Sequence, residues 1–141
     1  MTLTILATIV LLALAFDYIN GFHDTANAIA TVVSTGVLTA RDAIIMAAIL
    51  NFSGALIGVE VATTIAKGIA DSSQIVPSVV IAALVSAIAW NLITWYFGIP
   101  SSSSHALVGG LAGAVLAHGG PSVLHTKKLK EVATFLIVSP I

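Results

Sequence analysis

The sequence predicts an all-α membrane protein, a helical bundle with discontinuous (broken) helices. Hydrophobic residues make up 58% of the 141 residues and charged residues only 8%, and the apolar residues occur in long runs separated by short polar passages. Soluble domains are about 45–50% apolar and about 25% charged, so too little polar surface is present to cover a water-soluble core. We expect residues 1–141 to form a single membrane domain of a multi-pass protein in the cell membrane.

The first apolar stretch covers residues 2–38 and contains a polar passage at residues 17–27. We expect a membrane segment that is interrupted by this passage, with a break in the helix at Gly21. Residues 13–15 (Ala-Leu-Ala) resemble a signal-peptide cleavage site, but no basic residue precedes the run, which disfavours cleavage.

Two further runs are long enough to cross a hydrocarbon core of about 30 Å, which needs roughly 20 residues. Residues 43–66 contain Asn51 and Glu60, and residues 76–97 contain Asn91 and a group of aromatic residues suited to an interface or a packed bundle. Asn51 and Asn91 are typical of hydrogen bonds between membrane helices, and glycines four residues apart, such as 109 and 113, allow close helix contact.

The next apolar run, residues 106–117, is about half of a membrane span and follows Gly98, Pro100 and four serines. We expect a half-helix here, then a polar stretch at 122–131 and the start of another apolar run at 132–141. Broken helices persist at membrane depth only where they are buried in protein or line a polar cavity. Two broken segments therefore predict one cavity, the recurrent device of secondary transporters.

Polar residues of the first segment fall on one stripe if the segment is helical, at about 100° per residue. The members of this stripe are Asp17, Asn20, Asp24, Asn27 and Thr31. An ionisable group in an apolar helix costs roughly 2.5–3.5 kcal/mol to insert and usually marks a transport pathway. The alternative is an interfacial loop in which Asp24 is a helix cap exposed to water.

Four consecutive serines precede His105 and the predicted half-helix: Ser101, Ser102, Ser103 and Ser104. Hydroxyls and unpaired N–H groups would converge there at the positive end of a helix dipole, which makes an anion site. The alternative is a simple N-cap, for which one hydroxyl is enough. Because neither polar segment contains Lys or Arg, a bound anion would need help from a co-transported cation.

Composition disfavours other classes. The net charge is -1, and the few basic residues are scattered apart from Lys127, Lys128 and Lys130, so no nucleic acid partner is expected. These three lysines would lie on the cytoplasmic side. Cysteine is absent and the four histidines have no metal-binding spacing, so we expect no metal and no cofactor.

Residues 20–28 (NGFHDTANA) and 99–106 (IPSSSSHA) resemble the signature segments of the inorganic phosphate transporter (PiT) family, and the likeness extends over nearly the whole chain. It implies an inverted-repeat transporter, not an enzyme, that moves inorganic phosphate with Na⁺ or H⁺, and it places this chain in the N-terminal half. The implied phosphate ligands are Asp24, Asn27, Ser102, Ser103 and Ser104.

Asp24 and Asn27 are also the implied ligands of the coupling cation. Glu60 is a further candidate for cation coupling because it is ionisable within an apolar span, although near the end of that span its side chain can reach the interface instead. The sequence departs from the family pattern at Thr63, where many relatives have Glu, and at Ala66, where many have Arg. The second copy of the Asp/Asn motif is absent, so we expect a fragment or a half that assembles with the missing C-terminal half or another copy.

Three alternatives remain. A sulfate permease of the same family is the nearest, because hydroxyls and helix N-termini suit either tetrahedral anion; Asp24 would favour phosphate, whose protonated oxygen can donate a hydrogen bond. An intramembrane hydrolase would use a serine with His105 as the base, but no nucleophile-elbow pattern is present. A non-transporting membrane subunit is the third.

Overall fold

The computed structural model describes residues 2–57, 73, 75–124, 130, 131, 134 and 138. Its elements are the helices α1 (Leu3–Ser34), α2 (Ala40–Ile57), α4 (Pro77–Tyr96) and α5 (Ser103–Gly119), followed by the short 3-10 helix η2 (Pro121–Val123). Within this part of the chain the structure is built from helices, as the sequence predicts.

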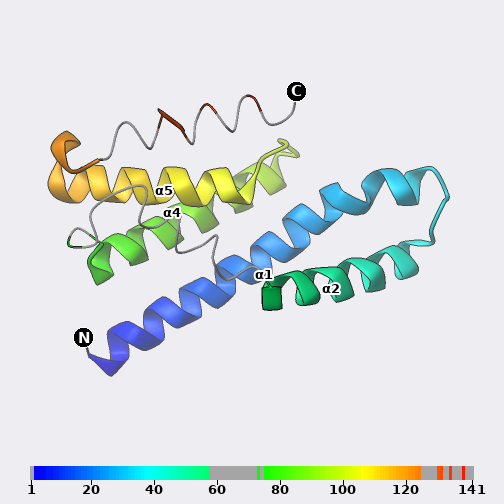
Figure 1. Cartoon of the computed structure of the whole chain (residues 1–141), viewed down its shortest axis with the longest axis horizontal. Coiled ribbons are helices and arrows are strands. Elements are labelled where there is room, and N and C mark those ends of the chain that lie inside the picture. The colour runs from blue at the N-terminus through cyan, green and yellow to red at the C-terminus, as the bar shows by residue number, and fades with distance from the viewer. Residues whose placement is uncertain are drawn as a thin grey trace.

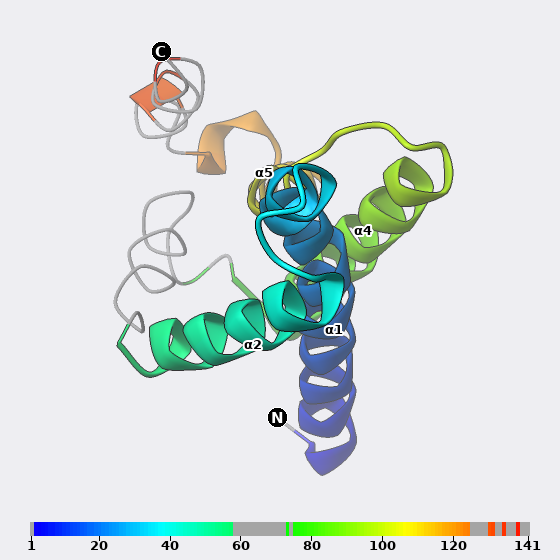
Figure 2. The ribbon, with the colours of Figure 1, turned by 90° about the vertical axis from the view of Figure 1, so that its right-hand side faces the viewer.

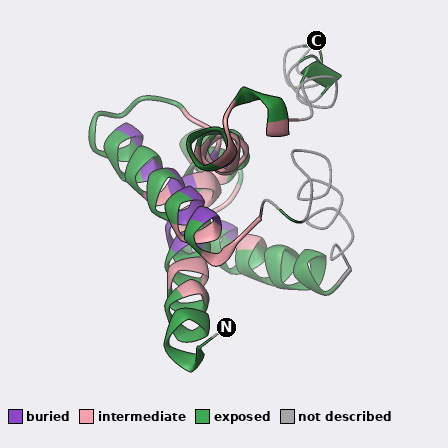
Figure 3. Ribbon diagram, turned by 90° about the vertical axis from the view of Figure 1, so that its left-hand side faces the viewer, coloured by how far each residue is buried: buried purple, intermediate pink, exposed green. Residues whose placement is uncertain are grey.

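The helices form two hairpins, α1–α2 and α4–α5, and the second hairpin packs against α1 (Figure 1). α2 folds back along the C-terminal half of α1, and α4 and α5 run antiparallel to one another. Figure 2 shows α2 and α4 leaving α1 on different sides, and Figure 3 shows the buried positions gathered where α1, α4 and α5 meet. The packed centre is therefore the α1–α4–α5 junction, whereas α2 is joined to α1 more loosely.

α1 is a single continuous helix of 32 residues, so the predicted break at Gly21 is wrong. A glycine inside a helix costs about 1 kcal/mol relative to alanine but leaves the backbone hydrogen bonds in place. The neighbouring Phe22 packs edge-to-face on Tyr18, one turn earlier, and on Trp95 of α4, with ring centroids 5.8 and 5.5 Å away. These contacts support the helical turn at Gly21, and the polar passage becomes a stripe on one long helix.

The turn between α1 and α2 has its own local signals. Gly36 has a positive φ of 72°, and the N–H of Val37 donates to the carbonyl of Val32 at 3.2 Å, which ends α1 in a Schellman motif. Thr39 then caps α2: its Oγ1 accepts from the Asp42 N–H at 3.2 Å and donates to the Asp42 carboxylate at 2.7 Å. These two signals turn the chain back along α1.

Two apolar clusters hold the junction together. Phe16 of α1 packs with Leu84 and Ala87 of α4, while Val79 of α4 packs with Val115 of α5. Farther along, His23 of α1 lies beside Thr94 of α4. Residues later in α1 contact residues later in α4, so the two helices run in the same direction.

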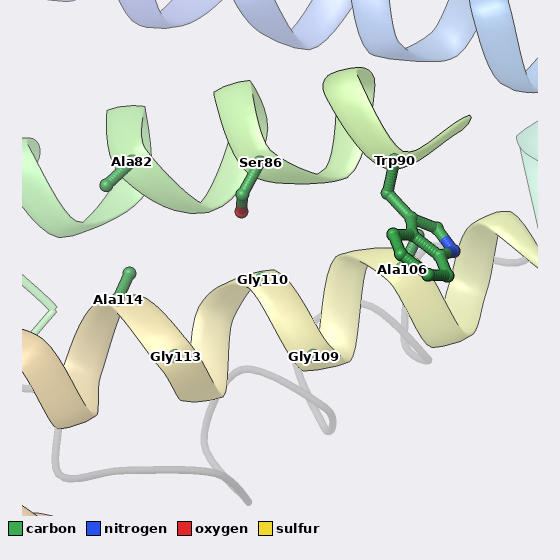
Figure 4. A pocket seen from close by; sticks show the side chains of 8 residues that line it. All are labelled: Ala82, Ser86, Trp90, Ala106, Gly109, Gly110, Gly113 and Ala114. Atoms are coloured by element: carbon green, nitrogen blue, oxygen red, sulfur yellow. The ribbon is translucent and has the colours of Figure 1, made fainter. Parts of the chain in front are cut away.

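Close packing of α5 on α4 depends on Gly110 (Figure 4). A Cβ atom at this position would lie 2.6 Å from the Ser86 hydroxyl and 2.8 Å from the Ala83 carbonyl oxygen, whereas a Cβ at Gly109 or Gly113 would meet nothing within 4 Å. The close contact predicted at Gly109 and Gly113 is therefore at Gly110 instead. All three glycines line a shallow cavity of about 440 Å³.

Two described helices, α1 and α4, are long and apolar enough to cross a membrane. α4 matches the span predicted at 76–97, and α2 is helical over the first part of the span predicted at 43–66. α5 has 17 residues and begins inside the serine run, so it is longer than the predicted half-helix. Glu60, with Thr63 and Ala66, lies outside the described residues, as does most of the predicted element at 132–141.

Candidate functional site

The two polar motifs meet at one hydrogen bond. Ser103 Oγ, in the first turn of α5, donates to Asp24 Oδ1 of α1 at 3.1 Å, across 79 positions of the sequence. Ser103 is only 1% exposed. Because Asp24 lies inside a helix of membrane length, this bond offsets part of the cost of placing a carboxylate there.

The loop between α4 and α5 places Ser103. Gly98, with a φ of 65°, ends α4, and the Ile99 N–H donates to the Thr94 carbonyl at 2.8 Å. Trp90 of α4 donates from Nε1 to Ser101 Oγ at 3.1 Å. The loop is therefore bonded to the last turns of α4, which directs the start of α5 toward α1.

The other predicted serines have different positions. Ser102 is the N-cap of α5, and its hydroxyl accepts from the His105 N–H at 3.4 Å. This is the capping role that the sequence left open for the serine run. Ser104 is exposed. In this structure, then, Ser103 is the predicted serine whose side chain reaches Asp24.

His23 contacts the same carboxylate oxygen from the other side. Its Nδ1 lies 3.4 Å from Asp24 Oδ1, and its Nε2 lies 3.5 Å from Thr94 Oγ1. His23 and Thr94 are buried, whereas the Asp24 side chain is 45% exposed. Both contacts of the carboxylate with described residues go to Oδ1, so Oδ2 is the oxygen available to a ligand.

The exposed side of Asp24 lines a groove of about 750 Å³ between α1 and α2. The polar residues that line the groove are Asp17, Asn20, Asp24, Thr25 and Asn51. Asn20 Oδ1 is buried and has no hydrogen-bond partner among the described residues. The described lining contains two carboxylates and no Lys or Arg, so the groove favours cations over anions that enter alone.

Asn27 does not line this groove. Its side chain is exposed and borders a smaller cavity of about 190 Å³, together with His23, Thr94 and the loop residues at 98–100. Asp24 and Asn27 are one turn apart on α1, yet they border different cavities. The structure thus joins Asp24 to Ser103 and places Asn27 beside the loop that leads into the serine run.

Sequence reasoning assigned no site role to three residues at this position. The sequence assigned Thr94 and His23 no role, and it indicated only a contact between membrane helices for Asn91. Asn91 is 0% exposed, and neither its amide nitrogen nor its oxygen has a partner among the described residues. The spacing of Asn91 and Thr94, three residues apart in an apolar helix, was the available signal that they share a face.

The site combines a carboxylate inside a helix of membrane length with a hydroxyl at the N-terminus of a second helix. Sites of this kind are found in secondary transporters. The comparison with known proteins agrees with this class. The chain belongs to the phosphate transporter family, whose sequence profile matches residues 20–141. Membership of this family makes it a membrane protein.

Relatives match nearly the whole chain. A probable low-affinity inorganic phosphate transporter of Bacillus subtilis is 57% identical over 99% of this chain and 42% of the relative. The low-affinity inorganic phosphate transporter PitA of Escherichia coli is 43% identical over 94% of this chain and 30% of the relative. This chain therefore spans less than half the length of these relatives, each of which is named a transporter and not an enzyme.

One solved structure, named "The sodium-dependent phosphate transporter", superimposes with a TM-score of 0.90 at 33% sequence identity. The superposition covers 99% of this chain and 36% of that chain. The helical arrangement described above is thus shared with part of a larger membrane protein.

Proposed function

We propose that this chain is the N-terminal repeat of a cation-coupled inorganic phosphate transporter and contributes one half of its binding site. The observation that carries the proposal is the Ser103–Asp24 hydrogen bond, because it brings the carboxylate motif and the serine-rich helix start together. The family and the names of the relatives support phosphate as the transported ion.

In this proposal, the serine run binds phosphate. Hydroxyls of Ser102, Ser103 and Ser104 and the N–H groups of the first turn of α5 would bind the anion at the positive end of the helix. Asn27 and Asp24 would complete the ligand set from α1. Since Ser103 now donates to Asp24, phosphate would have to draw this hydroxyl away from the carboxylate or bind beside it.

Electrostatics supports cation coupling. An ionised Asp24 and a phosphate anion about 4 Å apart would repel by roughly 4 kcal/mol per pair of charges at an effective dielectric constant of 20. A Na⁺ ion between them, or a proton on the carboxyl, would remove this repulsion. Carboxylate and carboxamide oxygens of Asp24 and Asn27 are hard ligands that suit such a cation, with Glu60 as the further candidate. The sodium dependence named for the similar structure favours Na⁺.

The proposed binding site needs ligands beyond those of this repeat. Because the chain spans 42% of the Bacillus subtilis relative, we propose that the multi-pass membrane protein includes a C-terminal half or a second copy that supplies the remaining ligands. Sites at a repeat interface need both repeats.

Uptake of radiolabelled phosphate into proteoliposomes tests the proposal. The protein to compare is a chimera in which this chain replaces the matched segment of the Bacillus subtilis relative, beside the chain alone, under imposed Na⁺ or H⁺ gradients. We expect uptake by the chimera, driven by one of the two gradients and abolished by Asp24→Asn.

Asp42→Asn is the matched control, since Asp42 is an exposed carboxylate that bonds only to the cap residue Thr39 among the described residues. Its uptake should equal that of the unmutated chimera. Uptake of sulfate in place of phosphate by a folded chimera, or full phosphate uptake by the Asp24→Asn variant, would overturn the proposal.

A further inference from the structure

We propose that Thr94 and His23 are positioning residues, and that together they fix the orientation of the Asp24 carboxylate toward the groove between α1 and α2. This inference rests on the proposed function, in which Asp24 contacts the transported ions. Neither residue needs to touch those ions, because each acts through the next one in the series from Thr94 to His23 to Asp24.

Burial divides the series into a fixed end and an accessible end. Thr94 is 1% and His23 is 5% exposed, whereas the Asp24 side chain is 45% exposed. The Thr94 hydroxyl is itself restrained, since it lies 2.9 Å from the Trp90 carbonyl oxygen and 3.1 Å from that of Asn91. The packed junction therefore anchors Thr94, and the groove receives Asp24.

The chemistry of the carboxylate assigns the proton on His23. An ionised carboxylate can only accept hydrogen bonds, so His23 bonds to Asp24 Oδ1 when its ring proton is on Nδ1. The single proton of the Thr94 hydroxyl is donated to the carbonyl oxygens of its own helix, so toward His23 this oxygen can only accept. A His23 ring protonated on both nitrogens therefore donates from Nδ1 to Asp24 Oδ1 and faces Thr94 Oγ1 with Nε2–H, 3.5 Å away. Thr94 thereby holds the ring in the orientation that presents Nδ1 to Asp24.

Two partners on one oxygen explain why orientation matters. Ser103 and His23 approach Asp24 Oδ1 from α5 and from α1, and the side-chain torsion of an aspartate at χ2 is otherwise broad. Fixing Oδ1 restricts this torsion and so holds the exposed carboxylate of Asp24 in the lining of the groove. Without His23 the carboxylate would keep one restraint, the Ser103 hydroxyl, which is itself a proposed phosphate ligand.

Phosphate uptake by the chimera tests the role of Thr94. Thr94→Val removes the hydroxyl with little change in shape, and we expect the KM for phosphate to rise about fivefold, the effect of one lost hydrogen bond, with a smaller change in maximal rate. Thr94→Ser keeps the hydroxyl and should restore the KM. Ser86→Ala is the matched control, because Ser86 on the same helix also bonds to a carbonyl of its own helix, that of Ala83 at 2.9 Å.

A double variant separates positioning from general packing. If Thr94 acts through His23, then Thr94→Val combined with His23→Gln should raise the KM no further than His23→Gln alone. Independent packing effects would instead add. Additive effects, or failure of Thr94→Ser to restore the KM, would overturn the proposal.

A spectroscopic measurement tests the same contact without transport. In the chimera labelled with ¹⁵N-histidine, the signals lost in the His23→Gln variant identify the two ring nitrogens of His23. Thr94→Val should shift both of these signals, and Ser86→Ala should leave them unchanged. An unmutated chimera that takes up no phosphate would refute the proposed function alone, whereas His23 signals that do not respond to Thr94→Val would refute the positioning role.

Discussion

The polar residues of α1 have two different surroundings. Toward α4 and α5, His23 is buried and bonded within a junction that also holds Thr94 and Ser103. Toward α2, Asp17 and Asn51 line an open groove, where Asn20 Oδ1 has no hydrogen-bond partner among the described residues. One side of the helix is packed against α4 and α5, and the other borders an open groove.

Asp24 belongs to both regions, with Oδ1 in the junction and its exposed side in the groove. This division has a physical reason. A binding group must be held in place before the ligand arrives, because ordering it on binding would cost affinity. The junction therefore supplies rigidity and the groove supplies access, and variants in the two regions should have different effects.

Ser103→Ala should have the largest effect of the variants that follow. It removes a hydrogen bond to a charged group, which contributes about 1.5–3 kcal/mol, and it removes a proposed phosphate ligand. We expect the KM for phosphate to rise at least tenfold in the uptake assay. Ser104→Ala, at an exposed position in the same turn, should raise it less; an equal effect of both would show that the bond to Asp24 has no special importance.

Gly110→Ala tests whether close packing in the junction supports the site. The added Cβ would lie 2.8 Å from the Ala83 carbonyl oxygen, which cannot move without shifting α4. We expect a loss of about 1–3 kcal/mol in stability, measured as a lower midpoint of thermal unfolding in detergent. Gly109→Ala is the control, since its Cβ meets nothing within 4 Å. Equal midpoints for the two variants would contradict this account of the α4–α5 contact.

Local patterns were sufficient to predict the elements but not how they meet. The apolar run at 76–97 predicted α4 to within one residue at each end, because length and hydrophobicity alone define such a helix. Gly21 was misjudged because the cost of a glycine is small beside the packing of Phe22 on Trp95, a contact between distant parts of the chain. The continuous α1 is a tertiary effect that local propensity does not contain.

The candidate site was predictable in part for the same reason. Asp24 and Ser103 stood out as polar residues in apolar surroundings, and the structure places them 3.1 Å apart. The signal for Thr94 was weaker, because its spacing from Asn91 indicates only that the two residues share a face of α4. Its importance depends on His23 lying beside it, 71 positions away in the sequence. The predicted binding roles remain predictions for all six residues: Asp24, Asn27, Glu60, Ser102, Ser103 and Ser104.

Asn51→Ala tests the groove side of the comparison. Asn51 of α2 lines the same groove as Asp24 and is exposed, so its removal should leave the thermal unfolding midpoint nearly unchanged. If the groove admits the coupling cation, the cation concentration for half-maximal uptake should rise a few-fold, by the loss of about one hydrogen bond or ligand contact. A changed midpoint with unchanged cation dependence would assign Asn51 to helix packing, the role suggested by its sequence.

Asn91→Leu should have the smallest effect and tests whether the junction is complete. Asn91 is fully buried, and its amide has no partner among the described residues. Replacing an unpaired buried amide by an apolar group of similar size is nearly neutral or stabilising. The unfolding midpoint should therefore stay the same or rise. A clear decrease would mean that Asn91 has a partner in the membrane-embedded protein, such as an ordered water molecule. The junction would then contain a binding site for a small polar molecule such as water.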